Sequence, residues 1–195
     1  SIYIDCMTGV FGAVLFFLFS FLVKWKNAVM THRYVFFIMM LLSFAFMWAA
    51  PFILKNESLV TFITNNLNRS LTLTGRTLIF EQIPKIMYGK WFLGFGYGST
   101  YEICLRYIGF ADTQNALMEW IMQIGILGTG LFCLIIYNCV SKLHKTFGLY
   151  TEWVWLLAFL YTYVILGMIE ITYSSMQFIG ALLVIYFMGE KKRYG

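Results

Sequence analysis

The sequence predicts an all-α integral membrane protein, and its composition, its apolar runs and the placement of its charges are the observations that predict it. Of the 195 residues, 61% are hydrophobic and 12% are charged. A soluble domain of this size cannot bury that much apolar surface. The net charge of +5 does not indicate a nucleic-acid partner, because the basic residues lie at the ends of apolar runs and form no stripe.

Five apolar runs are long enough, or nearly long enough, to cross a bilayer, which takes roughly 17–25 residues. They cover residues 7–23, 34–54, 116–140, 153–169 and 171–188. The last two are joined so closely that they predict a helical hairpin. We therefore expect a single membrane domain over residues 1–195 with about five transmembrane helices.

The short loops between these runs predict the orientation of the chain. Positive charge gathers in three groups: Lys24, Lys26 and Arg33; Lys142 and Lys145; and Lys191, Lys192 and Arg193. With an outside N-terminus, all three groups face the cytoplasm, as the positive-inside rule requires. Residues 55–115 then form a large extracytoplasmic loop between the second and third spans. The chain begins with Ser1, and its first span would run from outside to inside with no charged n-region before it, so this span does not resemble a signal peptide. We therefore expect the chain to be the C-terminal part of a larger polytopic protein.

The large loop is predicted to be partly helical, because it is apolar and periodic. Apolar residues at helical spacing over 59–67 predict a short amphipathic helix. A second helix is expected to begin at Thr74–Gly75, with Thr74 as its cap, a kink at Pro84 and an end at Gly89. One face of that helix should be apolar, through Leu78, Ile79, Ile83, Ile86 and Met87.

Arg76 would then lie in the first turn of the second helix. Free backbone N–H groups and the positive end of the helix dipole are found in such a turn. A guanidinium added there makes a good site for a phosphate or pyrophosphate. The alternatives are an Arg that reaches to lipid headgroups, or one that pairs with Glu81.

Residues 91–99, here called the Gly-rich loop, follow this helix. Gly94, Gly96 and Gly98 at alternate positions permit unusual backbone angles and the close approach of a ligand, and Ser99 follows them. The spacing is not that of a dinucleotide fingerprint. The alternative is an aromatic-rich re-entrant turn at the membrane interface.

The head of the third span carries the remaining polar candidates. Asp112 fits an N-cap that would bond the amides near Gln114 and Asn115, and it is equally a catalytic candidate. Glu119 is expected one to two turns inside the span, where a carboxylate is costly unless it faces a cavity or a partner. A small-residue face for helix packing is expected from Gly125, Gly128 and Gly130.

Three of these pieces, in this order, resemble the O-antigen polymerase/ligase superfamily of bacterial membrane glycosyltransferases. They are Thr74-Gly75-Arg76 at a helix start, the Gly-rich segment 93–99 that follows Pro84, and the polar start at 113–115 followed by Gly125-Ile126-Leu127-Gly128. The resemblance covers roughly residues 70–130. The flanking spans match only in their topology.

The resemblance implies inverting glycosyl transfer, without a metal or cofactor, at the outer face of the bacterial cytoplasmic (inner) membrane. The donor is a polyprenyl-pyrophosphate-linked glycan, and Arg76 occupies the position that would hold its leaving group. The implied partners are this lipid-linked glycan, the bilayer, and the chain-length regulator and flippase of the same pathway. The substrate-binding candidates are Arg69, Thr74, Gly75, Gly94, Gly96, Gly98, Ser99 and Asn115.

One position departs from the family pattern. Many members carry a His where this chain has Gln114, and glutamine can orient an acceptor hydroxyl but cannot take its proton. Both His32 and His144 fall on the cytoplasmic side in the expected topology. The base would then be Asp112 or Glu119, or would come from the part upstream of this chain. Otherwise, departure of the pyrophosphate makes a strong base unnecessary.

Three functions compete at this point. The first is a polymerase that joins lipid-linked repeat units of a capsule, exopolysaccharide or O-antigen. The second is a ligase of the same superfamily, and the third is a transporter or structural membrane protein. The missing His and the Phe-, Ile-, Tyr- and Asn-rich composition favour the polymerase. A transporter would be expected to place ionisable residues and helix breaks near mid-span, whereas these spans are nearly free of charge there.

Overall fold

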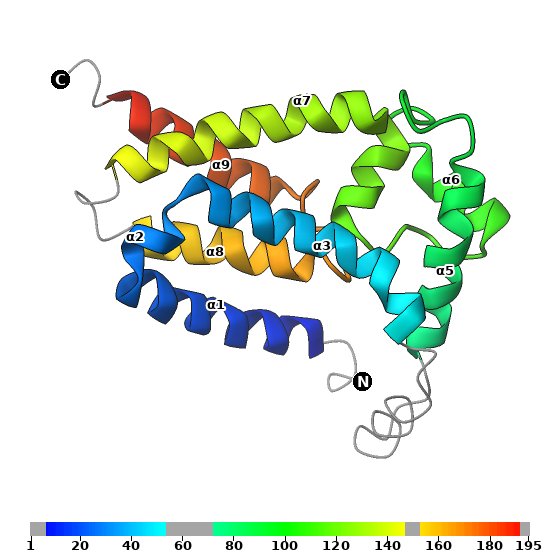
Figure 1. The fold of residues 1–195 in the computed structure, drawn as a ribbon, viewed down its shortest axis with the longest axis horizontal. Helices are drawn as coiled ribbons and strands as arrows, with labels where there is room; N and C mark the ends of the chain where they lie inside the picture. The colour runs from blue at the N-terminus through cyan, green and yellow to red at the C-terminus, as the bar shows by residue number, and fades with distance from the viewer. Residues whose placement is uncertain (1–6, 54–71, 147–152, 192–195) are drawn as a thin grey trace. The chain divides into compact units, whose positions relative to one another are not determined.

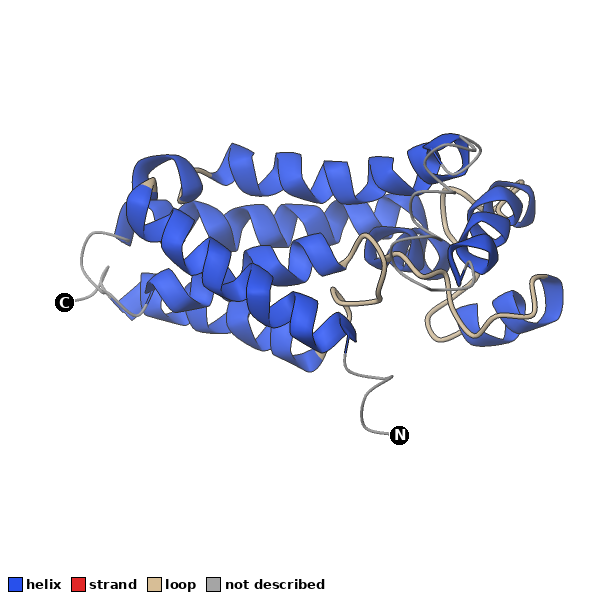
Figure 2. Ribbon diagram, turned by 90° about the horizontal axis from the view of Figure 1, so that it is seen from below, coloured by secondary structure: helices blue, strands red, loops and turns tan. Residues whose placement is uncertain are grey.

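A computed structural model describes residues 7–53, 72–146 and 153–191, and all regular secondary structure in these ranges is helical (Figure 2). The chain divides into two compact units. The bundle unit comprises Ser1–Leu41, Gly130–Gly167 and Thr172–Gly195. The loop unit comprises Leu42–Thr129 and Met168–Ile171. The predicted all-helical class is confirmed for the described residues.

The bundle unit is built from long apolar helices that pack side by side (Figure 1). It contains α1 (Met7–Trp25), α2 (Asn27–Met30), the start of α3 (Arg33–Ile53), the end of α7 (Ala116–Thr146), α8 (Trp153–Leu166) and α9 (Met176–Lys191). Tyr161 lies at the centre of its core. The Tyr161 ring is 5.3 Å from the ring of Phe19 and 5.5 Å from that of Phe36, and its hydroxyl donates to the carbonyl oxygen of Met30 at 2.7 Å.

Basic side chains contact aromatic rings where several helices of the bundle unit begin or end. Lys24, at the end of α1, places Nζ 4.8 Å from the centroid of the ring of Trp155, which lies near the start of α8. Lys142, near the end of α7, places Nζ 3.5 Å from the ring centroid of Tyr186. Such cation–π contacts hold ammonium groups beside apolar helices. The basic groups that the sequence assigns to one side of the membrane therefore adjoin helix ends.

Two helices are long and apolar enough to cross a bilayer, over Thr8–Trp25 and Ala116–Lys142, and three shorter apolar helices accompany them. Only 22% and 28% of the residues in these two apolar windows are buried. The core helix of a soluble protein would be mostly buried, whereas Phe17 is 67% exposed and Leu131 64% exposed. Exposed apolar faces of this size suit contact with lipid. The two helices therefore support the membrane class, and the number of five spans stays a prediction.

The loop unit contains α5 (Thr72–Ile86) and α6 (Thr100–Tyr107) together with the end of α3 and the start of α7. Ile79, Ile83 and Met87 are fully buried at intervals of four residues, as an amphipathic helix requires. Leu78 was expected on the same face but is 48% exposed.

The ends of α5 differ in part from the prediction. The helix begins at Thr72, not at Thr74–Gly75, so Thr74 is a helical residue and not its cap. Pro84 lies inside the helix, which ends at Ile86, and Gly89 follows with a left-handed φ of 75°. The predicted amphipathic helix at 59–67 lies outside the described residues.

Candidate functional site

The Gly-rich loop and a break in α7 are joined through their backbones. At Gly125 the angles are φ 68° and ψ 179°, so the helical hydrogen bonding is interrupted there. The N–H of Ile126, just past the break, donates to the carbonyl oxygen of Trp91 at 2.8 Å. On the other side, the carbonyl oxygen of Met122 accepts from the N–H of Phe95 at 2.9 Å. Backbone groups next to the break are thus paired by the loop, as buried backbone polar groups require.

Two glycines make this close approach possible. A Cβ on Gly125 would lie 2.1 Å from the carbonyl oxygen of Phe92, and one on Gly94 would lie 2.6 Å from the carbonyl oxygen of Gln123. Neither overlap can be relieved by moving a flexible side chain, because the atoms that are met belong to the backbone. Gly125 was expected to belong to a small-residue packing face. It is instead the break in the helix, and a Cβ on Gly130 would have nothing within 4 Å.

The other glycines of the loop have a different environment. Gly96 and Gly98 have φ values of 113° and 79°, and a Cβ on either would meet nothing within 4 Å. The space beside Gly94 is therefore filled by α7, and open space lies beside Gly96 and Gly98. The close approach predicted at Gly94 is therefore that of the α7 backbone. The assignment of Gly96 and Gly98 to substrate binding stays a prediction. Ser99 closes the turn, since its hydroxyl donates to the carbonyl oxygen of Gly96 at 2.6 Å.

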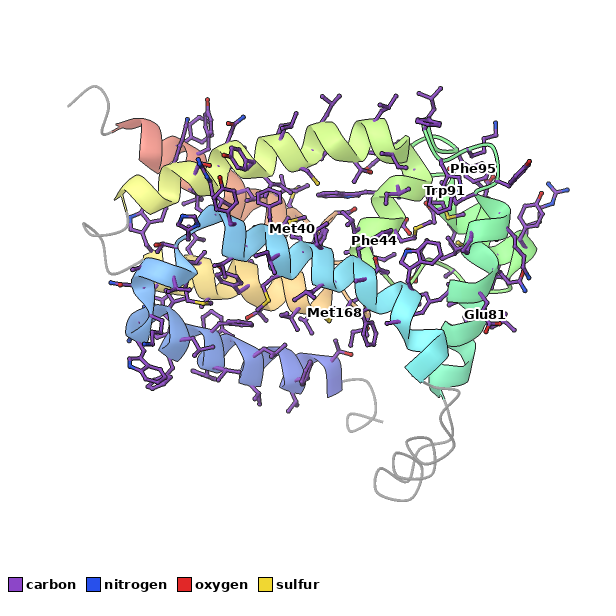
Figure 3. The ribbon with its side chains drawn as sticks, viewed as in Figure 1. Met40, Phe44, Glu81, Trp91, Phe95 and Met168 are labelled. Carbon is purple, nitrogen blue, oxygen red and sulfur yellow. The ribbon has the colours of Figure 1, made fainter. Side chains whose placement is uncertain are left out.

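Large aromatic side chains cover the outside of the same loop. Phe92 is 70% exposed and Tyr97 is 90% exposed. Trp91 is half-buried, and its ring stacks on that of Trp48 with centroids 6.5 Å apart. Figure 3 shows Trp91 and Phe95 beside α5. Exposed aromatic rings on an irregular segment are typical of the membrane–water interface.

A polar cluster lies at the start of α7 and comprises Asp112, Thr113, Gln114, Glu119 and Gln123. Its centre is the Glu119 carboxylate, which is only 5% exposed. Oε2 of Glu119 accepts from the hydroxyl of Thr113 at 3.0 Å, and Oε1 accepts from Nε2 of Gln123 at 2.7 Å. Oε1 of Gln123 in turn accepts from the N–H of Gly98 at 3.4 Å, which links the cluster to the Gly-rich loop.

Glu119 lies in the first turn of α7, not one to two turns inside it. The free N–H groups and the positive end of the dipole at a helix start favour a carboxylate there. The side chains that the structure shows donating to Glu119, those of Thr113 and Gln123, are both neutral. Thr113 and Gln123 were not singled out from the sequence. Gln123 could have been found from its place four residues after Glu119, because side chains at that spacing are neighbours on a helix.

Asn115, not Asp112, caps α7. Oδ1 of Asn115 accepts from the N–H of Met118 at 3.0 Å, which is the contact of an N-cap with the third helical residue. Nδ2 of Asn115 donates to the carbonyl oxygen of Ser43 at 3.0 Å, and the residue is completely buried. Asp112 is four residues before Ala116 and is therefore too far from the helix to cap it. Packing and capping thus account for Asn115 without a substrate.

Asp112 and Gln114 form a tight turn before the cap. Oδ1 of Asp112 accepts from the backbone N–H of Gln114 at 2.9 Å and also from its side-chain amide. Gln114 has φ 53°, which a residue other than glycine rarely adopts. Both side chains are half-buried. The two residues that were predicted to act on an acceptor hydroxyl are therefore in direct contact.

A buried thiol, that of Cys104, lies near the polar cluster. Cys104 is fully buried on α6, with Sγ 3.9 Å from Sδ of Met122. Burial, followed by the charges of Glu119 and Asp112, raises the pKa of the Cys104 thiol to about 12. The two carboxylates of the cluster, Asp112 and Glu119, disfavour a polyanion at that point.

The predicted pyrophosphate ligand lies on a different element. Arg76 is the fifth residue of α5 because the helix begins at Thr72, so it follows the first turn that contains Thr74 and Gly75. The side chain of Arg76 lies outside the described part of the chain, as does the whole of Arg69.

No family model, curated protein or solved structure matches this chain.

Proposed function

We propose that this chain belongs to a membrane glycosyltransferase that polymerises polyprenyl-pyrophosphate-linked repeat units at the outer face of the bacterial cytoplasmic membrane. The products would be a capsule, an exopolysaccharide or an O-antigen. The observation that carries the proposal is the backbone pairing between the Gly-rich loop and the broken start of α7. Backbone hydrogen bonds thereby join the Gly-rich segment that resembles the polymerase/ligase superfamily to the segment around Gly125 that also resembles it.

The membrane context supports this setting. The five apolar helices α1, α3, α7, α8 and α9 overlap the five expected spans, but α8 ends at Leu166 and α9 begins only at Met176, so the tight hairpin expected between the last two spans is wrong. If all five cross the bilayer with their basic ends in the cytoplasm, residues 72–115 lie outside. Lipid-linked repeat units would meet the Gly-rich loop and its exposed aromatic rings at that surface.

The charges support separate sites for the leaving group and for the acceptor hydroxyl. Arg76 would hold the pyrophosphate, whose negative charge grows as it leaves. The negative polar cluster is unsuited to that group but suited to an acceptor hydroxyl. The hydroxyl oxygen would form a bond to the anomeric carbon of the donor as the bond to the pyrophosphate breaks, with inversion. The hydroxyl proton would pass to Asp112.

Asp112 is a better base than Glu119 in this arrangement. Both oxygens of Glu119 accept hydrogen bonds and its side chain is almost completely buried. Asp112 is half-buried and holds Gln114 through Oδ1. Gln114 would orient the acceptor hydroxyl beside it.

A transporter is the second candidate, and the break in α7 favours it. Discontinuous helices beside a buried carboxylate are typical of transporter binding sites. At Gly125, however, the Gly-rich loop pairs backbone groups on both sides of the break, and in transporters such groups bind the substrate or the ion. No observation specifically favours the ligase.

The proposal is tested in liposomes that contain the protein and are supplied with a lipid-linked repeat unit. We expect a polymer ladder and release of polyprenyl pyrophosphate. Asp112→Asn should lower kcat about 100-fold through loss of the base, whereas Glu102→Gln, which changes an exposed acid on α6, should leave it unchanged. Gln114→Ala should lower turnover less than removal of Arg76. Solute uptake without polymer, or an unchanged rate for Asp112→Asn, would refute the assignment.

A further inference from the structure

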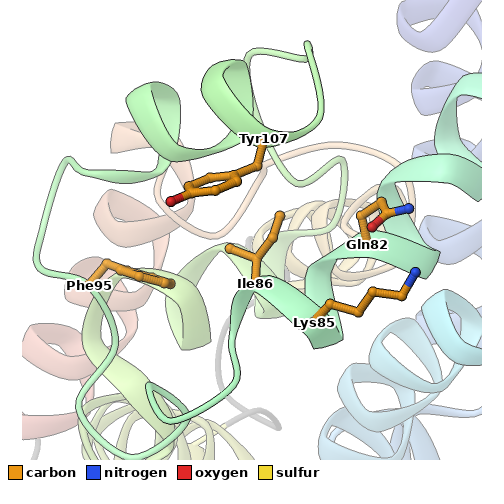
Figure 4. A pocket seen from close by; sticks show the side chains of 5 residues that line it. All are labelled: Gln82, Lys85, Ile86, Phe95 and Tyr107. Carbon is orange, nitrogen blue, oxygen red and sulfur yellow. The ribbon is translucent and has the colours of Figure 1, made fainter.

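A cleft of about 370 Å³ opens between α5, the Gly-rich loop and α6, and the functional assignments above do not use it (Figure 4). It is lined by Gln82, Lys85, Ile86, Phe95 and Tyr107. Lys85 and Ile86 lie three and four residues after Gln82, so each is its neighbour on one face of α5. The volume lies within the range of roughly 300–1,000 Å³ found for small-molecule sites.

The two ends of the cleft differ in chemistry. Figure 4 shows the Lys85 ammonium and the Gln82 amide at one end, with Phe95 and the Tyr107 ring at the other and Ile86 between them. An aromatic face attracts the weakly positive C–H groups of a sugar ring. An amide and an ammonium supply hydrogen-bond partners for hydroxyl and acidic groups. The lining therefore combines an aromatic platform with polar donors.

The charged side chain among the lining residues of the cleft is that of Lys85. Lys85 is exposed and no acidic residue lines the cleft. Arg106 is not a lining residue, but its guanidinium carbon lies 5.9 Å from the ring centroid of Tyr107. Glu81 precedes Lys85 by one turn of α5 but is not among the lining residues. A ligand with both a sugar ring and an acidic group fits this combination best.

We propose that the cleft binds an acidic saccharide, with its ring against Tyr107 and Phe95, its carboxylate or phosphate at Lys85 and a hydroxyl at Gln82. This proposal rests on the proposed function and names its substrate class: the repeat unit that is polymerised carries an acidic sugar. A phospholipid headgroup would use the cation but would leave the aromatic platform without a role.

The test measures binding of a glucuronic acid-containing disaccharide by NMR saturation transfer and calorimetry. The protein is held in neutral phosphatidylcholine nanodiscs, and the carboxyl-reduced disaccharide serves as the neutral probe. We expect the acidic disaccharide to bind several-fold more tightly than the neutral one. Tyr107→Ala should weaken binding of both about tenfold, and Tyr107→Phe should retain most of it. Lys85→Gln should remove the preference for the acidic disaccharide and leave the neutral one unaffected.

Matched variants separate the cleft from general surface effects. Tyr101 lies on the same helix as Tyr107 and is similarly exposed, at 59% against 63%, so Tyr101→Ala should bind as the wild type does. Lys90→Gln, outside the cleft, should also have no effect. The proposal is overturned if neither disaccharide binds, or if the Lys85 and Tyr107 variants bind normally. It is also overturned if phosphatidylglycerol in the nanodisc displaces the disaccharide through Lys85.

These outcomes are distinct from failure of the proposed function. Free disaccharides need no pyrophosphate and no transfer, so their binding does not depend on catalysis. Polymer synthesis with no saccharide binding in the cleft would refute only the cleft, whereas binding without polymer synthesis would refute only the polymerase.

Discussion

The bundle unit and the loop unit are stabilised in different ways. In the bundle unit, apolar and aromatic side chains pack between regular helices, as at Tyr161 and Phe36. In the loop unit, backbone groups of irregular segments pair with one another, as at Trp91 and Ile126, and a buried polar cluster lies beside them. Packing of apolar side chains tolerates substitutions of similar size. Backbone interlocking tolerates almost none, and this is how a protein holds a chemical site in a fixed geometry.

The largest difference between the units should appear at their glycines. Gly125→Ala should destabilise the protein by more than about 3 kcal/mol, because the backbone angles suit only glycine and the added Cβ meets the Phe92 carbonyl oxygen at 2.1 Å. Gly12→Ala in the bundle unit meets only a Leu166 methyl group at 3.3 Å and should change stability by less than about 1 kcal/mol. Thermal unfolding in detergent measures both.

Gly130→Ala is the control for the first substitution. It lies on the same helix, α7, and its Cβ would meet nothing within 4 Å. We expect it to be neutral or stabilising by up to about 1 kcal/mol, as for Ala in place of Gly in a helix. Equal melting temperatures for Gly125→Ala and Gly130→Ala would contradict the interlock.

The buried carboxylate should give the next largest effect. Glu119→Ala leaves the donors of Thr113 and Gln123 without their acceptor and should cost about 2–4 kcal/mol. Glu119→Gln retains one acceptor oxygen and should cost less. The matched control is Glu102→Gln on the surface of α6, which should be neutral within about 0.5 kcal/mol. If Glu119→Ala unfolds at the wild-type temperature, the cluster does not stabilise the loop unit.

The smallest effect concerns reactivity and leaves stability unchanged. Since the pKa of Cys104 is raised from 9.0 to about 12, its thiolate fraction near pH 8 should be roughly 1,000-fold below that of an unfolded thiol. A variant whose other three cysteines are serine should therefore react with maleimide very slowly until it is unfolded. Its labelling rate should rise about tenfold for each pH unit and level off only near pH 12, its pKa. Rapid labelling of the folded protein at pH 8 would contradict the buried, negative surroundings of Cys104.

Periodicity and composition predicted the regular part of this structure and not the irregular part. The five apolar helices and the buried face at Ile79 and Ile83 follow from patterns of local residues. The break at Gly125 does not, because a glycine in an apolar run reads equally as a packing residue. Its role depends on Phe92, which lies 33 residues earlier and meets it only in the folded chain.

For the candidate site, the sequence predicted several of the residues but not all of their contacts. Its residue types and their places in the chain were read from the sequence, and Asp112, Gln114 and Glu119 do gather at the start of α7. The cap was misassigned, because Asn and Asp are almost equally good caps and only the position of the first helical turn separates them. Gln123 was overlooked because its importance comes from its bonds to Glu119 and Gly98.

The central claim is that the loop unit carries a site for transfer from a pyrophosphate, with Arg76 as the ligand of the leaving group. The direct measurement is polymer chain length in membranes supplied with a lipid-linked repeat unit, for the wild type, Arg76→Ala and the control Lys90→Ala. We expect Arg76→Ala to lower polymer formation about 100-fold or more, which corresponds to the loss of one group that stabilises charge in the transition state. Lys90→Ala should have no effect. Polymer of normal length from correctly inserted Arg76→Ala protein would contradict the claim.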